Sequence, residues 1–310
     1  MALLENIRVF VRVVEVGSLS EAGRQMRLSA AVVSHRIQSL EGFYGVRLLN
    51  RTTRSVQPTE QGVAFYEACQ DILNALDYAE TVLADTGGIA RGNLRVTVPL
   101  GLGRHVLGPI LPEFQDAHPK LSLQLRLSDH LLDLLAESLD AAIRMAVLAD
   151  SSLIARKIID CERILVAAPA YLEARGTPES PDDLLEHECL LLRFPGSQQF
   201  RWTLQSKSKP VTVPVRGGID ADDGDILTEW ALKGRGIALK PLWEIADDLR
   251  ADRLRPVLLD YAPEPVTLSV IYPHRRLLQA KVKAFADFAV ERVAAELTAR
   301  LDGLDLAALR

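Results

Sequence analysis

The sequence has few of the residues and runs that metal sites, disulfide scaffolds and membrane spans require. Its three cysteines, Cys69, Cys161 and Cys189, lie far apart and form no C-x-x-C pair, which fits a reducing compartment and gives no zinc signature. No apolar run approaches the ~18 residues needed to cross a bilayer, and Glu5 and Arg8 interrupt the N-terminal segment before a secretory core could form. We therefore expect a cytoplasmic protein with no membrane partner, no metal and no other cofactor.

The motifs of common catalytic sites are missing as well. There is no G-x-S-x-G, no phosphate-binding P-loop and no H-E-x-x-H. Two G-x-G pairs, at 101–103 and 234–236, complete no dinucleotide fingerprint. The acidic run 222–225 lacks the further oxygens and distal glutamate of a calcium loop. We interpret it as the cap and start of a helix running to Leu232, where negative charge is favourable. We expect no catalytic residues.

Charge is distributed unevenly along the 310 residues. The whole chain carries a net charge of −5, but residues 1–60 hold eight arginines against five glutamates, so they carry +3 and the remainder −8. Such asymmetry suggests a basic binding module attached to an acidic body. At ~150 residues per domain, the length predicts two units.

Residues 1–58 are predicted to begin with short helices. Ile7, Val11 and Val14 recur at helical spacing. The capping box S-L-S-E at 18–21 predicts that a second helix starts near Leu19. Ser29 can cap a third helix at about 30–43, in which the apolar residues 33, 37 and 40 form a core stripe.

The opposite face of this third helix carries small and polar residues. They are Ala30, Ala31, Ser34, His35 and Gln38. Such a face is what entry of a helix into the major groove requires. Two short strands are predicted at 47–49 and 54–56, around a turn that would bring Arg51 and Arg54 to phosphates. These features together predict a DNA-binding winged helix-turn-helix, and the alternative is the end of a three-helix bundle with solvated arginines.

A long helix is predicted at 59–87. Its apolar residues step by four and three, as in a heptad seam: Phe65, Cys69, Ile72, Leu76, Ala79 and Leu83. This narrow stripe favours pairing with a second copy of the helix, and the alternative is a single helix lying on its own domain. At 1.5 Å per residue the helix would be about 40 Å long, enough to separate two DNA-reading modules.

From residue 93 onward, strands and helices alternate, which indicates a parallel or mixed α/β sheet. Strands are predicted at 93–99, 121–127, 141–146, 153–159, 164–168, 189–193, 211–215, 236–240 and 266–271. Helices are predicted at 101–117, 131–135 and 278–297, with a loosely held helical tail at 301–310. Ligands of open α/β sheets bind outside the carboxyl ends of the strands, so we expect a site there.

The first sixty residues resemble the N-terminal signature of LysR-type transcriptional regulators. The resemblance is carried by Phe10 and by S-L-S-E-A at 18–22, L-S at 28–29, V-S-H-R-I at 33–37, L-E at 40–41, L-L-N-R-T-T-R at 48–54 and T-E-Q-G at 59–62. The chain departs from the family pattern at Gly23, Asn50 and Pro58, and at Ala30-Ala31, where the family more usually has glutamine-proline. The last departure removes a side chain that could read a base edge.

The body of the chain resembles the effector-binding domain of the same family. The matching stretches are L-D-A-A-I-R at 139–144, A-A-P-A-Y-L at 167–172, G-T-P at 176–178, H-E-C-L at 187–190, G-R-G-I-A-L at 234–239 and V-I-Y-P at 270–273. The resemblance implies a multidomain chain of mixed α+β and α/β class. We expect a winged helix-turn-helix at 1–58, a linker and dimerisation helix at 59–90, and an effector domain at 91–300.

The family's effector domain is similar to periplasmic binding proteins, with two α/β subdomains and the inducer in the cleft between them. Here the first subdomain would hold 92–160 and 267–300, and the second 161–266. The resemblance further implies a linker-helix homodimer, commonly assembled to a homotetramer. A dimer that places two reading helices on two half-sites predicts an inverted-repeat operator in double-stranded DNA.

Residues for both sites follow from these resemblances. By the family's pattern, Ala31, Ser34 and His35 lie near base edges, with His35 the main reader. The full DNA-binding set is Ser18, Ser29, Ala30, Ala31, Ser34, His35, Arg36, Gln38, Arg51, Thr52 and Arg54. The effector-binding set is Pro99, Leu100, Gly101, Ser128, Asp129, Arg144, Met145, Phe194, Phe200 and Lys240.

A helix N-terminus at Leu100, with Arg144 and Lys240, would suit an organic acid as co-inducer. The alternative is that Arg144 pairs with Asp140 or Asp150 and that Met145 belongs to the core. Two other functions compete with ligand-responsive DNA binding. A solute-binding protein is disfavoured by the first sixty residues, and an α/β enzyme by the missing motifs.

Overall fold

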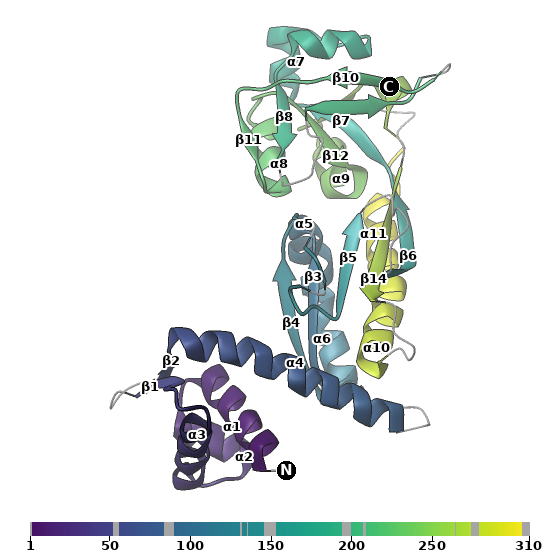
Figure 1. Cartoon of the computed structure of the whole chain (residues 1–310). Helices are drawn as coiled ribbons and strands as arrows, with labels where there is room; N and C mark the ends of the chain where they lie inside the picture. The colour runs from purple at the N-terminus through teal and green to yellow at the C-terminus, as the bar shows by residue number, and fades with distance from the viewer. Residues whose placement is uncertain are drawn as a thin grey trace. The chain divides into compact units, whose positions relative to one another are not determined.

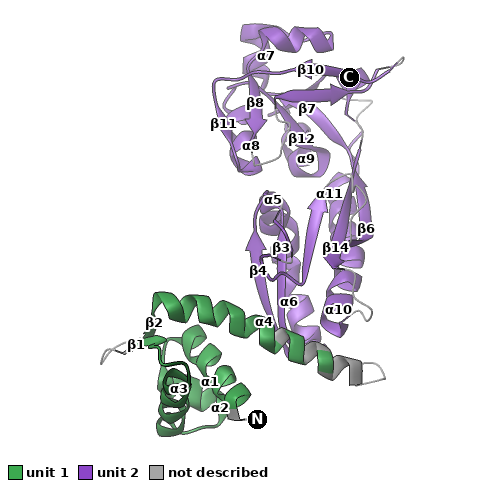
Figure 2. Ribbon diagram, viewed as in Figure 1, with its two compact units in different colours: residues 1–88 green, residues 89–310 purple. Residues whose placement is uncertain are grey.

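The computed structural model describes residues 2–51, 56–83, 90–130, 132–134, 136–145, 153–193, 200–206, 209–263, 265–273 and 279–305. The chain divides into two compact units, residues 1–88 and 89–310 (Figure 2). Within the described ranges, none of the helices combines the length and the apolar character that a bilayer span needs.

The first unit is mainly helical, with a small two-stranded sheet (Figure 1). Its elements are α1 (Ala2–Val16), α2 (Leu19–Met26), α3 (Ala30–Tyr44), β1 (Leu49–Arg51), β2 (Val56–Pro58) and α4 (Glu60–Leu83). Phe10, Ile37 and Leu40 are fully buried at its centre, so the apolar stripe of the third helix faces the core. The second helix starts at Leu19, as its capping box predicts.

The two strands of this unit lie two residues later than the predicted 47–49 and 54–56. One carboxylate oxygen of Glu41 in α3 accepts the N–H groups of Leu48, at 2.9 Å, and Leu49, at 3.1 Å. The carbonyl of Leu48 accepts the N–H of Thr59 at 2.9 Å. Leu48 is thus held by Glu41 of α3 and by Thr59, which precedes α4, and pairing with β2 begins at Leu49.

The first residues of the apolar stripe predicted on α4 pack on the core of the first unit. Cys69 is fully buried, and the ring of Phe65 lies 5.5 Å from Phe10 and 5.0 Å from Tyr44 between centroids. The heptad interpretation was wrong for these two residues, because the same spacing also serves a helix that packs on its own core. Further along α4, Ile72 remains 47% exposed.

The second unit contains two five-stranded sheets and one strand pair (Figure 1). The first sheet has the order β4-β3-β5-β14-β6, from β3 (Gly92–Val98), β4 (Leu121–Leu127), β5 (Ala141–Met145), β6 (Leu153–Cys161) and β14 (Val266–Pro273). The second has the order β11-β8-β12-β7-β13, from β7 (Arg163–Ala167), β8 (Cys189–Leu192), β11 (Asp220–Ala221), β12 (Ile237–Pro241) and β13 (Arg255–Val257). The pair is β9 (Arg201–Leu204) with β10 (Val211–Pro214).

The chain crosses between the two sheets twice. It leaves the first sheet at Glu162, between β6 and β7, and returns between Tyr261 and β14. We call the part built on the first sheet the first-sheet half and the part built on the second the second-sheet half. Most buried side chains belong to the core of one half, but Trp243 of the second-sheet half lies in the core of the first-sheet half, and Leu301 packs on both.

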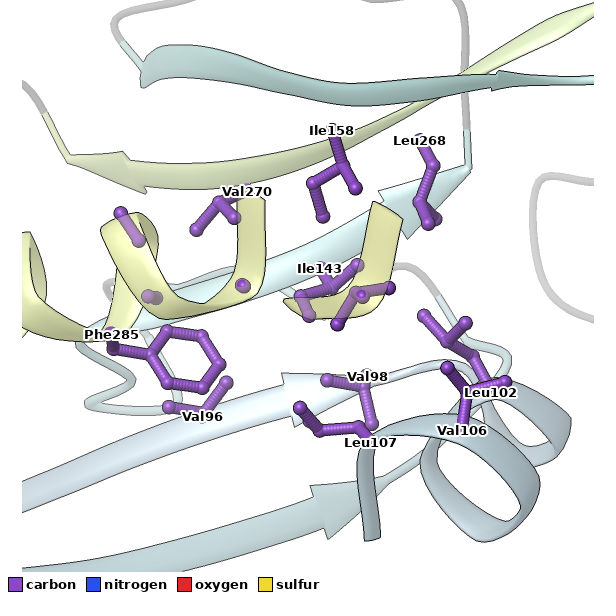
Figure 3. Packing of buried hydrophobic residues seen from close by; sticks show 14 of the residues in the cluster. Val96, Val98, Leu102, Val106, Leu107, Ile143, Ile158, Leu268, Val270 and Phe285 are labelled. Carbon is purple, nitrogen blue, oxygen red and sulfur yellow. The ribbon is translucent and has the colours of Figure 1, made fainter. Parts of the chain in front are cut away.

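The core of the first-sheet half lies between strands and helices (Figure 3). Val96, Ile143 and Val270 from three strands pack with Leu107 and Phe285 from the covering helices. Those helices are α5 (Leu100–Leu102), continuing through the π-helical turn Gly103–Leu107 into α6 (Gly108–Ala117), and α10 (Ala280–Phe288), continuing through Ala289–Val293 into α11 (Ala294–Leu301).

The second-sheet half is buried on both faces of its sheet. Along β7, Leu165 belongs to one core cluster, while Ile164 and Val166 belong to another on the opposite face. A strand covered on both faces reads as a continuous apolar run, which is how this one appears in the sequence. The covering helices are α7 (Pro169–Arg175), α8 (Gly224–Leu232) and α9 (Leu242–Arg250).

Several predicted elements need correction. Leu132–Leu134 are not helical, because the chain turns here: Asp133 accepts the N–H of Ala136 and Leu134 the N–H of Leu139. The predicted tail helix is absent over residues 302–305, since α11 ends at Leu301, and residues 306–310 lie outside the described part. Strands β9, β11 and β13 had not been predicted.

Candidate nucleic-acid interface and ligand cleft

The two serines predicted at the helix-turn-helix both act as helix caps. Ser18 Oγ accepts the N–H of Glu21 and Ser29 Oγ that of Val32, each at 3.3 Å. Between the helices the chain turns tightly through Arg27, whose φ of 56° is left-handed. A Cβ at Gly23 would lie 2.7 Å from the carbonyl oxygen of Leu28, so the missing methyl allows α2 to approach the turn.

The first two turns of α3 present the predicted reading surface. Ala30, Ala31, His35 and Gln38 are exposed, while Ser34 is half-buried. Val32, which had not been predicted, is 41% exposed on the same helix start. Small and polar side chains on an exposed helix start fit the requirement for contact with base edges.

The predicted phosphate-binding residues have different surroundings. Arg36 is half-buried and lies 3.5 Å from Glu5 of α1, so this acidic side chain competes with any phosphate for its guanidinium. The backbone of Arg51 belongs to β1, opposite Val56 of β2. Thr52 and Arg54 lie outside the described residues.

A cavity of about 440 Å³ opens in the second unit at the ends of several strands. The first-sheet half contributes Pro99, Asp129, Arg144 and Met145, which had been predicted, and Val266, which had not. The second-sheet half contributes residues that had not been predicted. They are Arg163, Leu190, Leu192, Arg201, Trp202, Thr203, Leu227, Leu239, Pro241 and Pro263.

Among the described residues, three arginines and one carboxylate line the cavity. Arg144 is 5% exposed, and its guanidinium donates to the carbonyl of Ser128 at 3.3 Å and to Thr97 Oγ1 at 3.5 Å. Burial lowers the pKa of Arg144 to about 10, and burial also lowers the pKa of Arg163. With a pKa of about 10, the Arg144 guanidinium is charged at neutral pH, and the arginines outnumber the carboxylates among the described lining residues, so the wall favours an anion.

The alternative partner considered for Arg144 is engaged elsewhere. Asp140 forms a buried ion pair with Lys281 at 2.9 Å and accepts the N–H of Arg95 at 2.9 Å. Met145 is partly buried against the core and also lines the cavity. Asp150 lies outside the described residues.

The helix start at Leu100 is occupied by the protein itself. Its N–H donates to Asp129 Oδ1 at 2.8 Å, so the anion at this position is an aspartate of the chain, where we had predicted a ligand. Burial raises the pKa of Asp129, while the N–H groups of Leu100 and Gly224 act in the opposite direction.

Lys240 also has a role different from the predicted one. It is 2% exposed, pairs with Glu244 and donates to the carbonyl of Gly224 at 2.7 Å. It is therefore not among the described residues that line the cavity, and its charge is balanced within the second-sheet half.

The other residues predicted to bind the ligand are not among the described residues that line the cavity. Ser128 caps the turn after β4 by accepting the N–H of His130 at 3.1 Å. Phe200 is 54% exposed and, of the residues the structure describes, is not one that borders the cavity. Phe194 lies outside the described ranges. Among the described side chains, no group of three or more His, Cys, Asp or Glu could hold a metal ion.

The two units match two family models. Residues 4–63 match the bacterial regulatory helix-turn-helix protein, lysR family, and residues 87–294 match the LysR substrate binding domain. The chain therefore belongs to the LysR family: it is a DNA-binding transcriptional regulator with an effector-binding domain.

Curated relatives and solved structures agree with this assignment. An HTH-type transcriptional repressor of Pseudomonas aeruginosa is 35% identical over 99% of this chain and 97% of its own. The structure of CrgA, a LysR-type transcriptional regulator from Neisseria meningitidis, gives a TM-score of 0.59 at 31% identity, over 93% of this chain and 98% of that one.

The full-length structure of the Vibrio cholerae virulence activator AphB gives a TM-score of 0.59 at 30% identity and covers the same shares. The family and these relatives are transcriptional regulators, not enzymes. They include a repressor and an activator, so family membership does not fix the sign of regulation.

Proposed function

We propose that this regulator responds to a small organic acid bound in the 440 Å³ cavity, and that it binds an inverted-repeat operator as a homodimer. The observation that supports the ligand class is the set of three arginines, Arg144, Arg163 and Arg201, which line the cavity with one carboxylate, Asp129, among the described residues. An anionic ligand relieves the repulsion between these guanidinium groups, and its carboxylate can accept charge-assisted hydrogen bonds from them.

The apolar part of the lining limits the ligand further. Trp202, Leu190 and Leu239 offer surface to an aliphatic or aromatic group, while the arginines take the carboxylate. A pocket of this size with a few convergent polar groups is typical of small-molecule sites. We therefore expect a monocarboxylic acid with an apolar group rather than a phosphate ester.

Thermal shift with a panel of organic acids and their matching neutral amides tests this proposal. We expect an acid to raise Tm and its amide to have no effect. Arg201 is exposed, so Arg201→Ala should fold normally and weaken acid binding by about tenfold or more, the value of a hydrogen bond to a charged group. Arg235→Ala, at an exposed position that does not line the cavity, is the matched control. Equal shifts with acid and amide would overturn the proposal.

On the DNA side, we propose that α3 reads bases through His35 and Gln38, with Val32 packing on a thymine methyl. The serines at 18, 29 and 34, the alanines at 30 and 31, and Arg36, Arg51, Thr52 and Arg54 would complete the contact surface. Because Ala30 and Ala31 have almost no side chain, much of the affinity should come from phosphates and DNA shape.

A salt series of binding measurements on DNA upstream of the regulator's own gene tests this interface. His35→Ala should relax sequence preference and leave the slope of log affinity against log salt unchanged. Arg51→Ala should remove one phosphate contact, which lowers the magnitude of that slope by about 1 and leaves the sequence preference unchanged. Arg12→Ala is the control, because Arg12 pairs with Glu15 on α1. Binding that does not weaken with salt would contradict the proposal.

We also propose that the second half of α4 forms the dimer contact, from which a tetramer could be assembled. Ile72, Ala75 and Ala79 are exposed there and Leu76 is half-buried, at helical spacings of three and four. Sedimentation of Ile72→Asp checks this: we expect a lower mass than the wild type, and an unchanged mass would count against this surface.

A further inference from the structure

The N-terminal turn of α8 contacts the first-sheet half of the second unit at three neighbouring positions. Gly224 donates its N–H to Asp129 Oδ2 at 3.2 Å. Asp225 Oδ2 accepts from Arg104 at 2.8 Å and lies 3.1 Å from His105 Nε2. These contacts join segments about a hundred residues apart in sequence, across the two halves.

The third position is Asp222, whose carboxylate lies 3.5 Å from His130 Nε2. His130 follows Asp129 directly in the chain, so the two residues after β4 both reach the same turn of α8. Basic groups of the first-sheet half therefore face acidic groups of the second-sheet half along one short line.

Asp129 joins two helix starts with one carboxylate. Its Oδ1 takes the N–H of Leu100 at the start of α5, and its Oδ2 takes the N–H of Gly224 at the start of α8. The second of these bonds exists only while the two halves stay together. If the halves separate, the carboxylate keeps one of its two backbone donors.

The turn is anchored within its own half, so it cannot follow the first-sheet half outward. Asp223 caps α8 by accepting the N–H of Asp225 at 2.8 Å. The buried Lys240 donates to the carbonyl of Gly224 at 2.7 Å and pairs with Glu244. The contacts to Asp129, Arg104, His105 and His130 must consequently break together when the halves separate.

Glycine at the facing helix start favours the close approach. A Cβ at Gly101 would lie 3.0 Å from Asp225 Oδ1, closer than side-chain carbons normally come to oxygen. The lack of a side chain at Gly101 lets the start of α5 reach the carboxylate of Asp225 while Arg104 and His105 bind it.

We propose that these residues form a latch that holds the two halves of the effector-binding domain closed without a ligand. The α8 latch consists of Asp222, Gly224 and Asp225 on one side and Asp129, Arg104, His105 and His130 on the other. A hydrogen bond to a charged group shifts such an equilibrium by on the order of tenfold, and an exposed ion pair by less.

The latch sets how easily the domain responds. For a ligand that binds only the closed form, the apparent affinity is the affinity of the closed form multiplied by the fraction of molecules that are closed. The latch keeps that fraction high, so the ligand meets a preformed site. This consequence for ligand binding rests on the proposed function, whereas the latch itself does not.

Distance measurements between two spin labels on the full-length protein test the latch in the absence of DNA and of any effector. Cysteines introduced at Gln124 of β4 and Glu173 of α7 place one label on each half at exposed positions. The three native thiols are buried and stay unlabelled. Dilution with unlabelled protein removes distances between subunits. For the otherwise wild-type chain we expect one narrow main distance and a minor second population of at most roughly 10%.

The latch is then weakened by the double substitution Asp222→Asn and Asp225→Asn. We expect a second population at a different distance, increased by on the order of tenfold over wild type. The control is Glu179→Gln with Asp252→Asn, which changes the net charge equally at two exposed positions of the second-sheet half that take no part in these contacts. Its distribution should match wild type.

A second variant weakens the latch at its residues in the first-sheet half. Arg104→Gln with His105→Gln alters two exposed side chains, so folding should be preserved, and it should produce the same new population. Coincident distributions for wild type and both latch variants would overturn the proposal, as would an equal change in the control. Since no organic acid enters the experiment, failure of the ligand proposal would leave this result unaffected.

Discussion

Glu41 offers a direct test of how the reading helix holds the strand pair beside it. Its side chain leaves α3 and one carboxylate oxygen accepts two backbone N–H groups, those of Leu48 and Leu49. Both leucines are nearly fully buried, at 3% and 2% exposure, so water has little access to replace the carboxylate. Glu41→Ala leaves two buried donors without this acceptor.

The cost can be worked out from the two bonds. A hydrogen bond to a charged group contributes roughly 1.5–3 kcal/mol, and the half-exposed carboxylate places each at the lower end, for a total of about 3 kcal/mol. Glu41→Gln keeps an acceptor oxygen but loses the charge, so it should cost about half as much. At about 1.4 kcal/mol per tenfold, amide exchange in the 46–58 segment should speed up about a hundredfold in Glu41→Ala and about tenfold in Glu41→Gln.

Hydrogen exchange followed by mass spectrometry measures this opening locally, without requiring the two units to unfold together. Glu67→Ala, at an exposed position of α4, is the control and should exchange like wild type. DNA affinity should fall in the order of the exchange rates, because β1 carries Arg51. If Glu41→Ala exchanged no faster than Glu67→Ala, the carboxylate would not be what holds these strands.

Two further results are expected. Burial raises the pKa of Cys69 and Cys161 to about 11 and that of Cys189 to about 12, so the thiols are protonated at pH 7.5 and become reactive thiolates only as the pH rises toward these values. A thiol reagent should modify none of them in the native protein and three after denaturation, and fast modification at pH 7.5 would contradict this. Asp140→Ala leaves the ammonium of Lys281 buried without its carboxylate, so it should lower the free energy of unfolding by about 3–5 kcal/mol. Urea denaturation followed by tryptophan fluorescence checks this value, and a loss below about 1 kcal/mol would show that water reaches the ammonium.

The elements that could be predicted from the sequence are those fixed by local rules. Ser18 and Ser29 cap the helices that follow them because the bonded N–H lies three residues on, at Glu21 and Val32. The acidic run before Leu232 starts a helix for the same reason, with Asp223 as its cap. Such interactions depend on spacing alone and need no knowledge of the fold.

Periodicity alone could not say what an apolar stripe faces. Phe65 and Cys69 share the heptad spacing of Ile72, yet the first two pack on the core of their own unit and Ile72 stays exposed. The difference comes from the length of α4, whose first half lies beside α1 while the second extends past it. No residue in the stripe itself carries that information.

The cavity residues were missed for a related reason. Arg163 and Arg201 belong to no motif. They line the same cavity as Arg144 because the chain crosses between the two sheets and returns. Arg201 also lies on β9, a short strand whose partner β10 follows seven residues later. Lys240, by contrast, could have been found: Glu244 follows it by four residues and neutralises it.

All three tryptophans of the chain, at 202, 230 and 243, belong to the second unit, and Trp202 borders the cavity. Excitation at the red edge of protein absorption will therefore report on the effector-binding domain alone. A regulator bound to its operator can be titrated with candidate acids while its own indole emission is followed, with no label attached and no signal from the DNA-binding module. The chain thus contains its own optical probe of effector binding.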